Sequence, residues 1–375
     1  MYKEISPTEL DSLPSGSYSL IDIRDRVSFD YGHIPGSVNI PQNELSAGNI
    51  PKDRLAVICC KSGIISRDTA EALSDQGIDA ANLSGGYVEW LRLNIENRNI
   101  TADVELSIRK KFKKSIWCRF TKAINEYKLV TPGDRIAVCI SGGKDSMLMA
   151  KLFQELKRHD KFPFEVKFLV MDPGYSPENR RLIEENAASM SIPVEIFESD
   201  IFESVFNIEK NPCYICARMR RGYLYSRAKA LGCNKIALGH HFDDVIETIL
   251  MGMLYGGQVQ TMMPKLHSTN FEGMELIRPL YLVREADIKH WRDYNGLHFL
   301  QCACKFTENC SSCDQNGQTD SKRLEVKHLI AELKKVNPQV EKNIFRSVEN
   351  VNLSTVIAYK QHGETHHFLD TYDEL

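Results

Sequence analysis

The chain has 375 residues, of which 42% are hydrophobic, and its formal net charge at pH 7 is -3. This length suits two or three domains, and the hydrophobic content is enough to build a core in each of them. No stretch reaches the ~20 consecutive apolar residues of a membrane-spanning helix, and the first residues lack the apolar core of a signal peptide. We therefore expect a cytoplasmic protein with no membrane association, and nucleic-acid binding could arise only from a local basic patch.

The first part of the chain alternates between short apolar runs and helical stretches. Three runs are expected to be strands: residues 18–23, 55–59 and 80–83. A helix is expected at Ser66–Gln76, ended by a glycine. This order predicts a small α/β domain over residues 1–95, and the polar residues after it predict a linker at 96–103.

A second alternation follows a helix expected at Val104–Glu126. Its expected strands are Arg135–Ile140, Val166–Met171, Val194–Phe197 and Lys235–Leu238. They alternate with helices expected at 145–158, 178–190 and 217–231. This alternation predicts a second α/β domain over residues 104–360, with a doubly wound, mostly parallel sheet. The polar and acidic end of the chain predicts a flexible tail at 361–375.

The eleven cysteines are unevenly placed along the chain. Three stand singly, and we expect them to be small buried hydrophobes: Cys118, Cys139 and Cys233. The others are grouped as Cys59 with Cys60, Cys213 with Cys216, and Cys302, Cys304, Cys310 and Cys313. In a cytosolic chain, such groups indicate metal or sulfur chemistry more than structural disulfides.

One loop lies between an expected strand and an expected helix and has the composition of a phosphate-binding site. It consists of Ser141, Gly142, Gly143, Lys144, Asp145 and Ser146. Glycines let the backbone approach a ligand, and the N–H groups at a helix start point toward an anion. The serine hydroxyls can donate, Lys144 supplies positive charge, and Asp145 can bind magnesium or cap the helix. The spacing differs from that of a Walker loop, which disfavours ordinary nucleoside triphosphatases, and a serine-capped glycine turn is the alternative.

The loop sequence SGGKDS is similar to the PP-loop of the ATP pyrophosphatases, which adenylate a carbonyl or amide oxygen and release pyrophosphate. Two further motifs, LGHHFDDVIET at 238–248 and CYICARMRRGYLY at 213–225, resemble the tRNA 2-thiocytidine synthetase group of that family. The resemblance runs over about residues 104–358. It implies an adenine nucleotide alpha hydrolase-like fold, bound ATP and Mg²⁺, and tRNA as substrate, with a cytidine of the anticodon loop adenylated at its C2 oxygen. Dimers are usual in this group, so a homodimer is expected.

Acidic residues follow the fourth strand of this domain. Asp243 and Asp244 could orient magnesium, and Glu247 would lie one helical turn further on the same face. The alternative is an acidic helix start, which the helix dipole alone favours. The resemblance makes Asp243 and Asp244 candidates for catalysis.

The pair Cys213 and Cys216 has a spacing that lets two thiolates share one metal centre, and nearby arginines favour the thiolate form. The resemblance implies a 4Fe-4S cluster held by this pair and one later cysteine, with one iron left open to bind sulfide. Cys302 is the favoured third ligand because it follows a strand-like run, and Cys310 is the other choice. A separate zinc site of Cys302, Cys304, Cys310 and Cys313 is a further alternative.

Residues 1 to about 93 resemble the rhodanese family. The motifs are Asp22-Ile23-Arg24, Gly32–Ser37, Cys60–Gly63 and Gly85–Trp90. Cys60 falls on the persulfide-forming cysteine of that family, at a loop before a helix whose N–H groups can stabilise a thiolate or persulfide. The family commonly has an arginine where this chain has Ile65, which weakens the case for turnover on free thiosulfate. An inactive docking module is the alternative; an active domain implies a cysteine desulfurase as sulfur donor.

Between Arg109 and Lys122, seven of fourteen residues are Lys or Arg, interleaved with three aromatic residues. Such a segment can contact RNA phosphates while its apolar stripe packs inward, although a solvated charged face is the alternative. The combined expectation is ATP-dependent tRNA thiolation with sulfur delivered by Cys60. Thiolation of another RNA position or of a small molecule stays open, as does a non-catalytic persulfide or redox sensor.

Overall fold

The computed structural model describes residues 2–14, 16–51, 53–95, 100–199, 201, 212–299 and 322–372. The chain divides into two compact units, one of residues 1–242 with 264–320 and the other of residues 243–263 with 321–375. The first unit holds one parallel and one mostly parallel sheet, and the second holds helices and one hairpin. No described helix combines the length and the apolar character that crossing a membrane would require.

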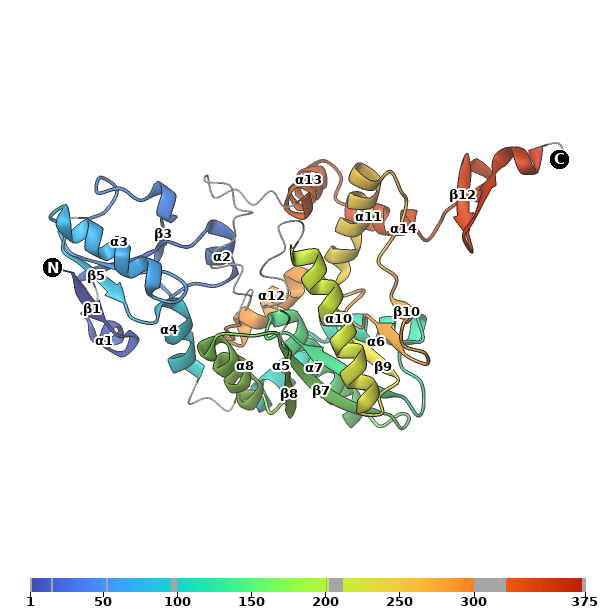
Figure 1. Ribbon diagram of the computed structural model, residues 1–375, viewed down its shortest axis with the longest axis horizontal. Coiled ribbons are helices and arrows are strands. Elements are labelled where there is room, and N and C mark those ends of the chain that lie inside the picture. The colour runs from blue at the N-terminus through green and yellow to red at the C-terminus, as the bar shows by residue number, and fades with distance from the viewer. Residues whose placement is uncertain are drawn as a thin grey trace. The chain divides into compact units, whose positions relative to one another are not determined.

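The N-terminal sheet has five parallel strands in the order β1-β5-β4-β2-β3. Its strands are β1 (Lys3–Ile5), β2 (Tyr18–Asp22), β3 (Val38–Asn39), β4 (Leu55–Cys59) and β5 (Ala80–Leu83). Its helices are α1 (Pro7–Ser12), α2 (Arg26–Tyr31), α3 (Ile64–Asp75) and α4 (Gly86–Ile95), with a short turn η1 (Gln42–Glu44). Figure 1 shows α3 on one side of the sheet and α1 and α4 on the other. The central strand β4 is buried on both faces, as its unbroken apolar run requires.

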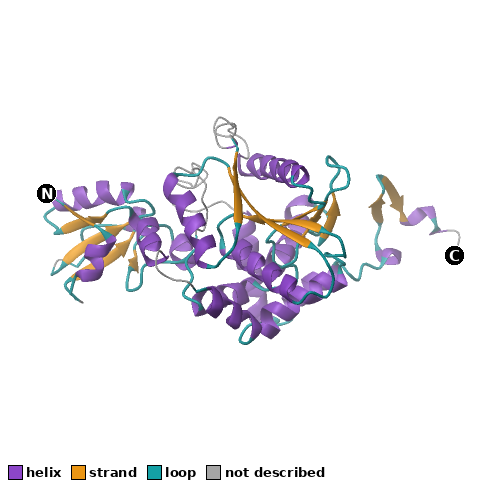
Figure 2. Cartoon of the chain, turned by 90° about the horizontal axis from the view of Figure 1, so that it is seen from below, coloured by secondary structure: helices purple, strands orange, loops and turns teal. Residues whose placement is uncertain are grey.

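The second sheet has six strands in the order β10-β11-β9-β6-β7-β8, and only β10 is antiparallel to its neighbour. The strands are β6 (Arg135–Ile140), β7 (Glu165–Asp172), β8 (Val194–Glu198), β9 (Lys235–Ala237), β10 (Lys265–His267) and β11 (Glu275–Ile277). The helices of this domain are α5 (Thr101–Arg109), α6 (Cys118–Glu126), α7 (Lys144–Arg158), α8 (Pro177–Ser189), α10 (Pro212–Ala230) and α12 (Glu285–Tyr294). Figure 2 shows the strands of this sheet with helices on both sides. The prediction of a doubly wound, mostly parallel sheet is confirmed.

The single helix predicted at Val104–Glu126 is divided in the structure. Between α5 and α6 lies a π-helical turn, η2 (Lys113–Trp117), in which the Trp117 N–H bonds to the Phe112 carbonyl five residues earlier. Phe112, Ile116 and Phe120 are all buried. A four-residue spacing drifts around a regular α-helix, and the wider turn cancels this drift so that the three side chains share one inner face.

The second unit contains α11 (Phe242–Gly256, from its second residue), α13 (Lys322–Val336) and α14 (Val340–Ser347). A turn η4 (Leu353–Thr355) precedes the hairpin of β12 (Ala358–Gln361) and β13 (Glu364–His367), which η5 (Phe368–Asp370) follows. The tail predicted at 361–375 includes the residues of β13 and η5, and its flexibility stays a prediction. His362 and Gly363 both have positive φ, at 52° and 89°, which is the backbone of a tight two-residue hairpin turn.

Candidate functional site

The predicted phosphate loop joins the carboxyl end of β6 to the first turn of α7. Gly143 is the N-cap of α7 and has no side chain to bond the first-turn N–H groups of the helix. Gly142 has a φ of +83°, and a Cβ atom there would lie 2.6 Å from Ile183 Cγ1 on α8. Glycine is thus needed at 142 both for the left-handed backbone and for close packing against α8. The N-terminus of α7 therefore lies at the ligand-binding edge of a parallel sheet, and the Lys144 N–H donates a long bond of 3.4 Å to the Tyr31 hydroxyl.

The two serines of the loop differ in their surroundings. Ser146 is buried, and its hydroxyl donates to the Gly143 carbonyl at 2.9 Å while accepting from the Ser141 N–H at 3.2 Å. Ser146 therefore holds the loop in shape. Ser141 is exposed, with its Oγ 3.3 Å from the Ser146 Oγ, so its hydroxyl is the one that can turn toward a ligand.

Lys144 and Asp145 form a charged pair at the start of α7. Lys144 Nζ lies 3.1 Å from Asp145 Oδ2 and 3.4 Å from Glu285 Oε1 on α12. Burial lowers the pKa of Lys144, but the carboxylates of Asp145 and Glu285 outweigh this effect and raise the pKa above its usual range. The ammonium is therefore charged at neutral pH and suited to bind a phosphate. Sequence reasoning missed Glu285, which lies 140 residues away with no motif around it.

The contact with Lys144 uses only one of the two carboxylate oxygens of Asp145. Asp145 Oδ1 is buried and has no hydrogen-bond partner among the described residues, and His241 Nε2 lies 4.0 Å from it. A buried carboxylate oxygen without a donor is unfavourable unless a ligand satisfies it. Magnesium prefers oxygen ligands, so this atom fits a cation bound beside a phosphate.

Two acidic residues of the α11 motif, Asp244 and Glu247, form ion pairs within the second unit. Arg323 of α13 places Nη1 2.8 Å from Asp244 Oδ1 and 3.7 Å from Glu247 Oε2. Glu247 is buried. Through these contacts Asp244 and Glu247 hold α13 against α11. Sequence reasoning missed this role because Arg323 lies far along the chain. A catalytic role for Asp243 and Asp244 stays a prediction.

The predicted metal ligands lie mostly beyond what the structure describes. Cys213 and Cys216 fall in α10, whose backbone is described there without their side chains, and Cys302 and the three cysteines after it fall in the gap between 299 and 322. Within the described ranges, no cluster of three His, Cys, Asp or Glu side chains is arranged to hold a metal ion.

Of the three single cysteines, Cys139 and Cys233 are buried as predicted. Burial raises the pKa of the Cys139 thiol to about 12, so it behaves as an inert hydrophobe. The prediction is wrong for Cys118, which is exposed because it begins α6 on the outer side of that helix.

Cys60 lies directly after β4, in the loop that leads into α3. Its Sγ accepts from the Gly63 N–H at 3.2 Å, from the Ser66 N–H at 3.3 Å and from the Ser66 Oγ at 3.1 Å. Gly86 closes the loop from the other side, since a Cβ atom there would lie 2.5 Å from the Cys60 carbonyl oxygen. Three donors around one sulfur suit a thiolate or persulfide.

The neighbouring thiol differs from Cys60. Burial raises the pKa of Cys59 well above its usual range, helped by the nearby carboxylate of Asp22. Cys59 therefore stays protonated and is a poor nucleophile. Ile65, where the rhodanese family commonly has an arginine, exposes 40% of its surface and adds no charge to the loop.

The basic run is only partly available to a partner. Three of its cations are ion-paired: Arg109 with Glu105 and Glu155, Arg119 with Asp287, and Lys122 with Glu126. Four others are exposed: Lys110, Lys111, Lys113 and Lys114. Lys111 Nζ lies 3.9 Å from the ring centroid of Tyr294, and none of these four has an acidic partner in the described part of the chain. The aromatic residues Phe112 and Phe120 are buried, as the predicted apolar stripe requires.

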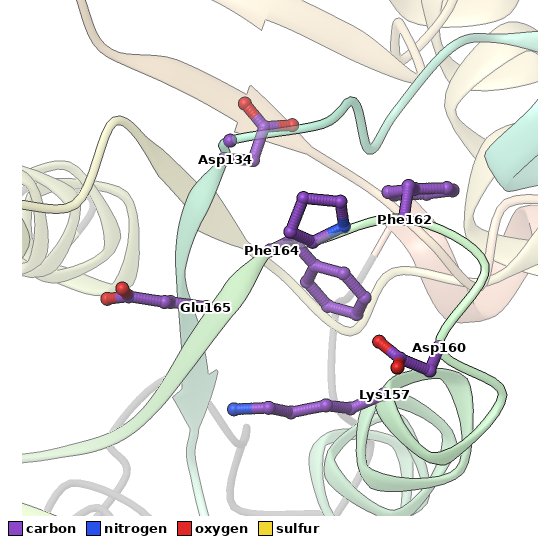
Figure 3. Close-up of a pocket in the computed structure, with 8 residues that line it drawn as sticks. Asp134, Lys157, Asp160, Phe162, Phe164 and Glu165 are labelled. Carbon is purple, nitrogen blue, oxygen red and sulfur yellow. The ribbon is translucent and has the colours of Figure 1, made fainter.

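A separate cavity of about 280 Å³ lies at the opposite edge of the second sheet, where β6 and β7 begin. Figure 3 shows its charged side chains, among them Asp134, Lys157 and Asp160, around two phenylalanines. Ligands of open α/β sheets bind at the carboxyl ends of the strands. This cavity is therefore not a candidate for the nucleotide site.

Comparison with known proteins supports both resemblances. A family model described as a PP-loop domain matches residues 112–306, and one described as a rhodanese-like domain matches residues 6–93. A solved structure, the U34-tRNA thiolase NcsA from Methanococcus maripaludis with its 4Fe-4S cluster, is 21% identical and covers 62% of this chain and 76% of that one. Its TM-score of 0.49 is too low to carry a functional conclusion.

Two relatives with higher sequence identity to this chain have the same name. The tRNA-cytidine(32) 2-sulfurtransferase of Coxiella burnetii (strain RSA 493 / Nine Mile phase I) is 34% identical, over 67% of this chain and 95% of that protein. The protein of the same name from Geotalea daltonii is 36% identical, over 64% of this chain and 92% of that protein. This chain belongs to the tRNA-cytidine(32) 2-sulfurtransferase family of PP-loop proteins and carries a rhodanese-like domain ahead of its PP-loop domain.

Proposed function

We propose that this chain thiolates a cytidine in the anticodon loop of tRNA to 2-thiocytidine, using ATP to activate the base. The observation that carries the proposal is the loop at the start of α7, where a helix N-terminus without a side-chain cap, a charged lysine and a carboxylate oxygen with no hydrogen-bond donor among the described residues meet. A nucleoside triphosphate with its magnesium ion supplies the phosphate and cation that these groups lack. The names and near-complete coverage of the relatives support tRNA as the substrate.

Activation of the base follows from the chemistry of the C2 oxygen, which is a poor leaving group. Its attack on the α-phosphorus of ATP releases pyrophosphate and links the base to AMP. Sulfide then attacks C2, the C–O bond breaks, and AMP leaves with that oxygen. Release of this sulfide from a Cys60 persulfide takes two electrons, which an external thiol supplies as it is oxidised to a disulfide. Lys144 and the first-turn N–H groups of α7 would bind phosphate, Asp145 would bind magnesium, and Asp243 and Asp244 would assist.

Sulfur delivery is assigned to Cys60. The three donors around its Sγ support a persulfide at this position, and the protonated Cys59 does not compete for the role. Because Ile65 supplies no cation, free thiosulfate is a poor donor, and a cysteine desulfurase is the expected one.

The cluster part of the proposal rests on the cysteine spacing and the family resemblance. Cys213, Cys216 and Cys302, or Cys310 in place of the last, would hold a 4Fe-4S cluster whose open iron binds sulfide. The alternative is zinc held by the four late cysteines. Metal analysis of anaerobically purified protein separates the two, since only the first gives about four irons per chain.

The exposed lysines of the basic run would contact tRNA phosphates. A cytoplasmic location and a homodimer accompany the proposal as expectations. Thiolation of a different RNA position or of a small molecule by the same chemistry is the competing function, and a non-catalytic sensor is the other.

A reconstituted reaction tests the function. Purified chain, unmodified tRNA, ATP with magnesium, a cysteine desulfurase and cysteine are combined, and the nucleosides are analysed by mass spectrometry. We expect 2-thiocytidine, with pyrophosphate released only when tRNA is present. Another thiolated nucleoside would move the target to a different position, and absence of any thiolated nucleoside with no pyrophosphate would overturn the enzymatic proposal.

A further inference from the structure

A chain of buried polar side chains leads away from the Cys60 sulfur. The Ser66 hydroxyl lies 3.1 Å from Cys60 Sγ and 2.7 Å from Asn82 Oδ1. Asn82 Nδ2 in turn donates to the Glu4 carboxylate at 3.0 Å and to the Gly63 carbonyl at 3.1 Å. Ser66 and Asn82 are 0% and 3% exposed. Two polar side chains buried this deeply are costly unless both are satisfied, and the exposed Glu4 carboxylate ends the chain at the surface.

The direction of the Asn82 hydrogen bonds is fixed by the groups that Asn82 faces. Asn82 faces a carboxylate and a backbone carbonyl, which are both acceptors, so its NH₂ group must point toward them. Its Oδ1 must then point at Ser66. The Ser66 hydroxyl has one proton and two acceptors in reach, Asn82 Oδ1 and the Cys60 sulfur. It can donate to only one of them at a time.

We infer that Ser66 is a further catalytic residue for sulfur transfer at Cys60, and that Asn82 and Glu4 are the residues that position it. This inference rests on the proposed role of Cys60. While Cys60 is a neutral thiol, its S–H donates to Ser66 and the Ser66 O–H donates to Asn82. When Cys60 is a thiolate, the Ser66 O–H turns to the sulfur and adds a third donor to the two N–H groups.

The transfer step shows where this donor acts. An acceptor thiolate attacks the outer sulfur of the Cys60 persulfide, the S–S bond breaks, and its electron pair stays on Cys60 Sγ. The products are the acceptor persulfide and the Cys60 thiolate, so charge and atoms balance. Stabilising the developing charge on Sγ lowers the barrier, and the same donor stabilises the thiolate that takes up sulfur in the reverse sense.

The isoleucine at position 65, where the rhodanese family commonly has an arginine, makes the Ser66 hydroxyl more important for stabilising the sulfur. A cation near the loop would stabilise the Sγ charge over a distance, and Ile65 provides none. The donors in direct contact with Sγ are two backbone N–H groups and the Ser66 hydroxyl, and all three are neutral. Of the three, only the Ser66 hydroxyl belongs to a side chain and can be removed without altering the backbone.

Cyanolysis of the persulfide tests the inference. The full chain is loaded by a desulfurase and cysteine, and cyanide then removes the outer sulfur as thiocyanate, leaving the Cys60 thiolate. Ser66→Ala should slow this step about tenfold or more, the effect of losing one hydrogen bond to a charged group. Ser66→Thr keeps a hydroxyl and should recover most of the rate. Thr69→Ala, which removes an exposed hydroxyl of the same helix bonded to the Ile65 carbonyl, is the matched control and should react like the parent.

The outcomes separate the inference from the function it rests on. The proposed role of Cys60 fails if the parent chain forms no persulfide, or if Cys60→Ser forms as much persulfide as the parent. If the persulfide forms and Ser66→Ala reacts as fast as the parent, the role of Ser66 is refuted while that of Cys60 stands. Equal slowing in Ser66→Ala and Ser66→Thr would show a packing effect and also refute it, with thermal melting confirming that both variants fold.

Discussion

The first two residues of α7 show how a binding site holds groups that the protein alone leaves unsatisfied. Lys144 is satisfied by Asp145 and Glu285, whereas Asp145 Oδ1 has no donor among the described residues. A site built only for stability would not leave a carboxylate oxygen buried in this way. The imbalance points to a cation that arrives with the substrate.

Asp145→Asn tests this assignment because it keeps the shape of the side chain and removes its charge. The substitution should weaken magnesium binding at this site, so tRNA-dependent pyrophosphate release should fall about 100-fold or more. The melting temperature should fall only modestly, because Lys144 loses the charge of its nearer carboxylate at 3.1 Å but retains Glu285 at 3.4 Å. Unchanged pyrophosphate release would remove Asp145 from the site.

Asp134→Asn is the matched control, at the opposite edge of the same sheet. Asp134 Oδ2 lies 2.7 Å from Lys235 Nζ, and both side chains are buried. Burial raises the pKa of Asp134, but the bonds from Lys235 and Asn234 outweigh it and lower the pKa below its usual value. The stability from this pair is therefore complete above the ordinary carboxyl pKa and is lost as the pH falls through the lowered one. Lys235 keeps Glu275 at 3.3 Å, so the free energy of unfolding of the variant should fall by less than the ~3–5 kcal/mol of a fully unpaired buried charge, and by less still in acid. Activity per folded molecule should be unchanged.

At the scale of elements, the apolar runs determine what could be predicted. The strands β4, β5 and β6 match their predicted ranges because unbroken apolar runs bounded by polar residues or glycine are typical of buried parallel strands. The strands β1, β3, β10 and β11 have two or three residues each and give no periodic signal. The break between α5 and α6 was missed because it depends on which side chains the rest of the domain buries.

The candidate sites could be predicted from the sequence only where the residues belong to one local motif. The loop residues and Cys60 could be identified from local motifs, since glycine spacing and a cysteine after a strand are visible in sequence. Glu285 beside Lys144, Arg323 beside Asp244 and Asn82 beside Ser66 could not be identified. Each is brought to its partner by tertiary packing from another element, and no pattern in the sequence links the two.

The basic segment around η2 offers a test of tRNA contact. Lys113 is exposed with no acidic partner in the described ranges, whereas Lys122 is already paired with Glu126 at 3.5 Å. Lys113→Glu should weaken tRNA binding and lower the slope of log affinity against log salt by about one. Lys122→Glu changes the charge equally and should have a smaller effect, because its positive charge is already offset. Equal binding by the parent and Lys113→Glu, measured across a salt titration, would exclude this face as a tRNA contact.

At the scale of the whole molecule, one chain combines a rhodanese-like domain with a PP-loop domain. For the proposed sulfur carrier, tethering to the PP-loop domain raises the effective concentration to the order of millimolar, which favours transfer without release of the persulfide. A net charge of only -3 leaves the long-range attraction to tRNA to local patches such as the exposed lysines near η2.

The central claim is that Cys60 supplies the sulfur that the PP-loop domain places on tRNA. The most direct test is the amount of 2-thiocytidine per tRNA made by Cys60→Ser under two sulfur sources, measured by mass spectrometry of the nucleosides. With a cysteine desulfurase and cysteine, the variant should make none above background, while its tRNA-dependent pyrophosphate release persists. With excess free sulfide, which needs no carrier, thiolation should return to the level of the parent. If Cys60→Ser thiolates tRNA as well as the parent with the desulfurase as donor, the N-terminal domain serves for docking and the claim is wrong.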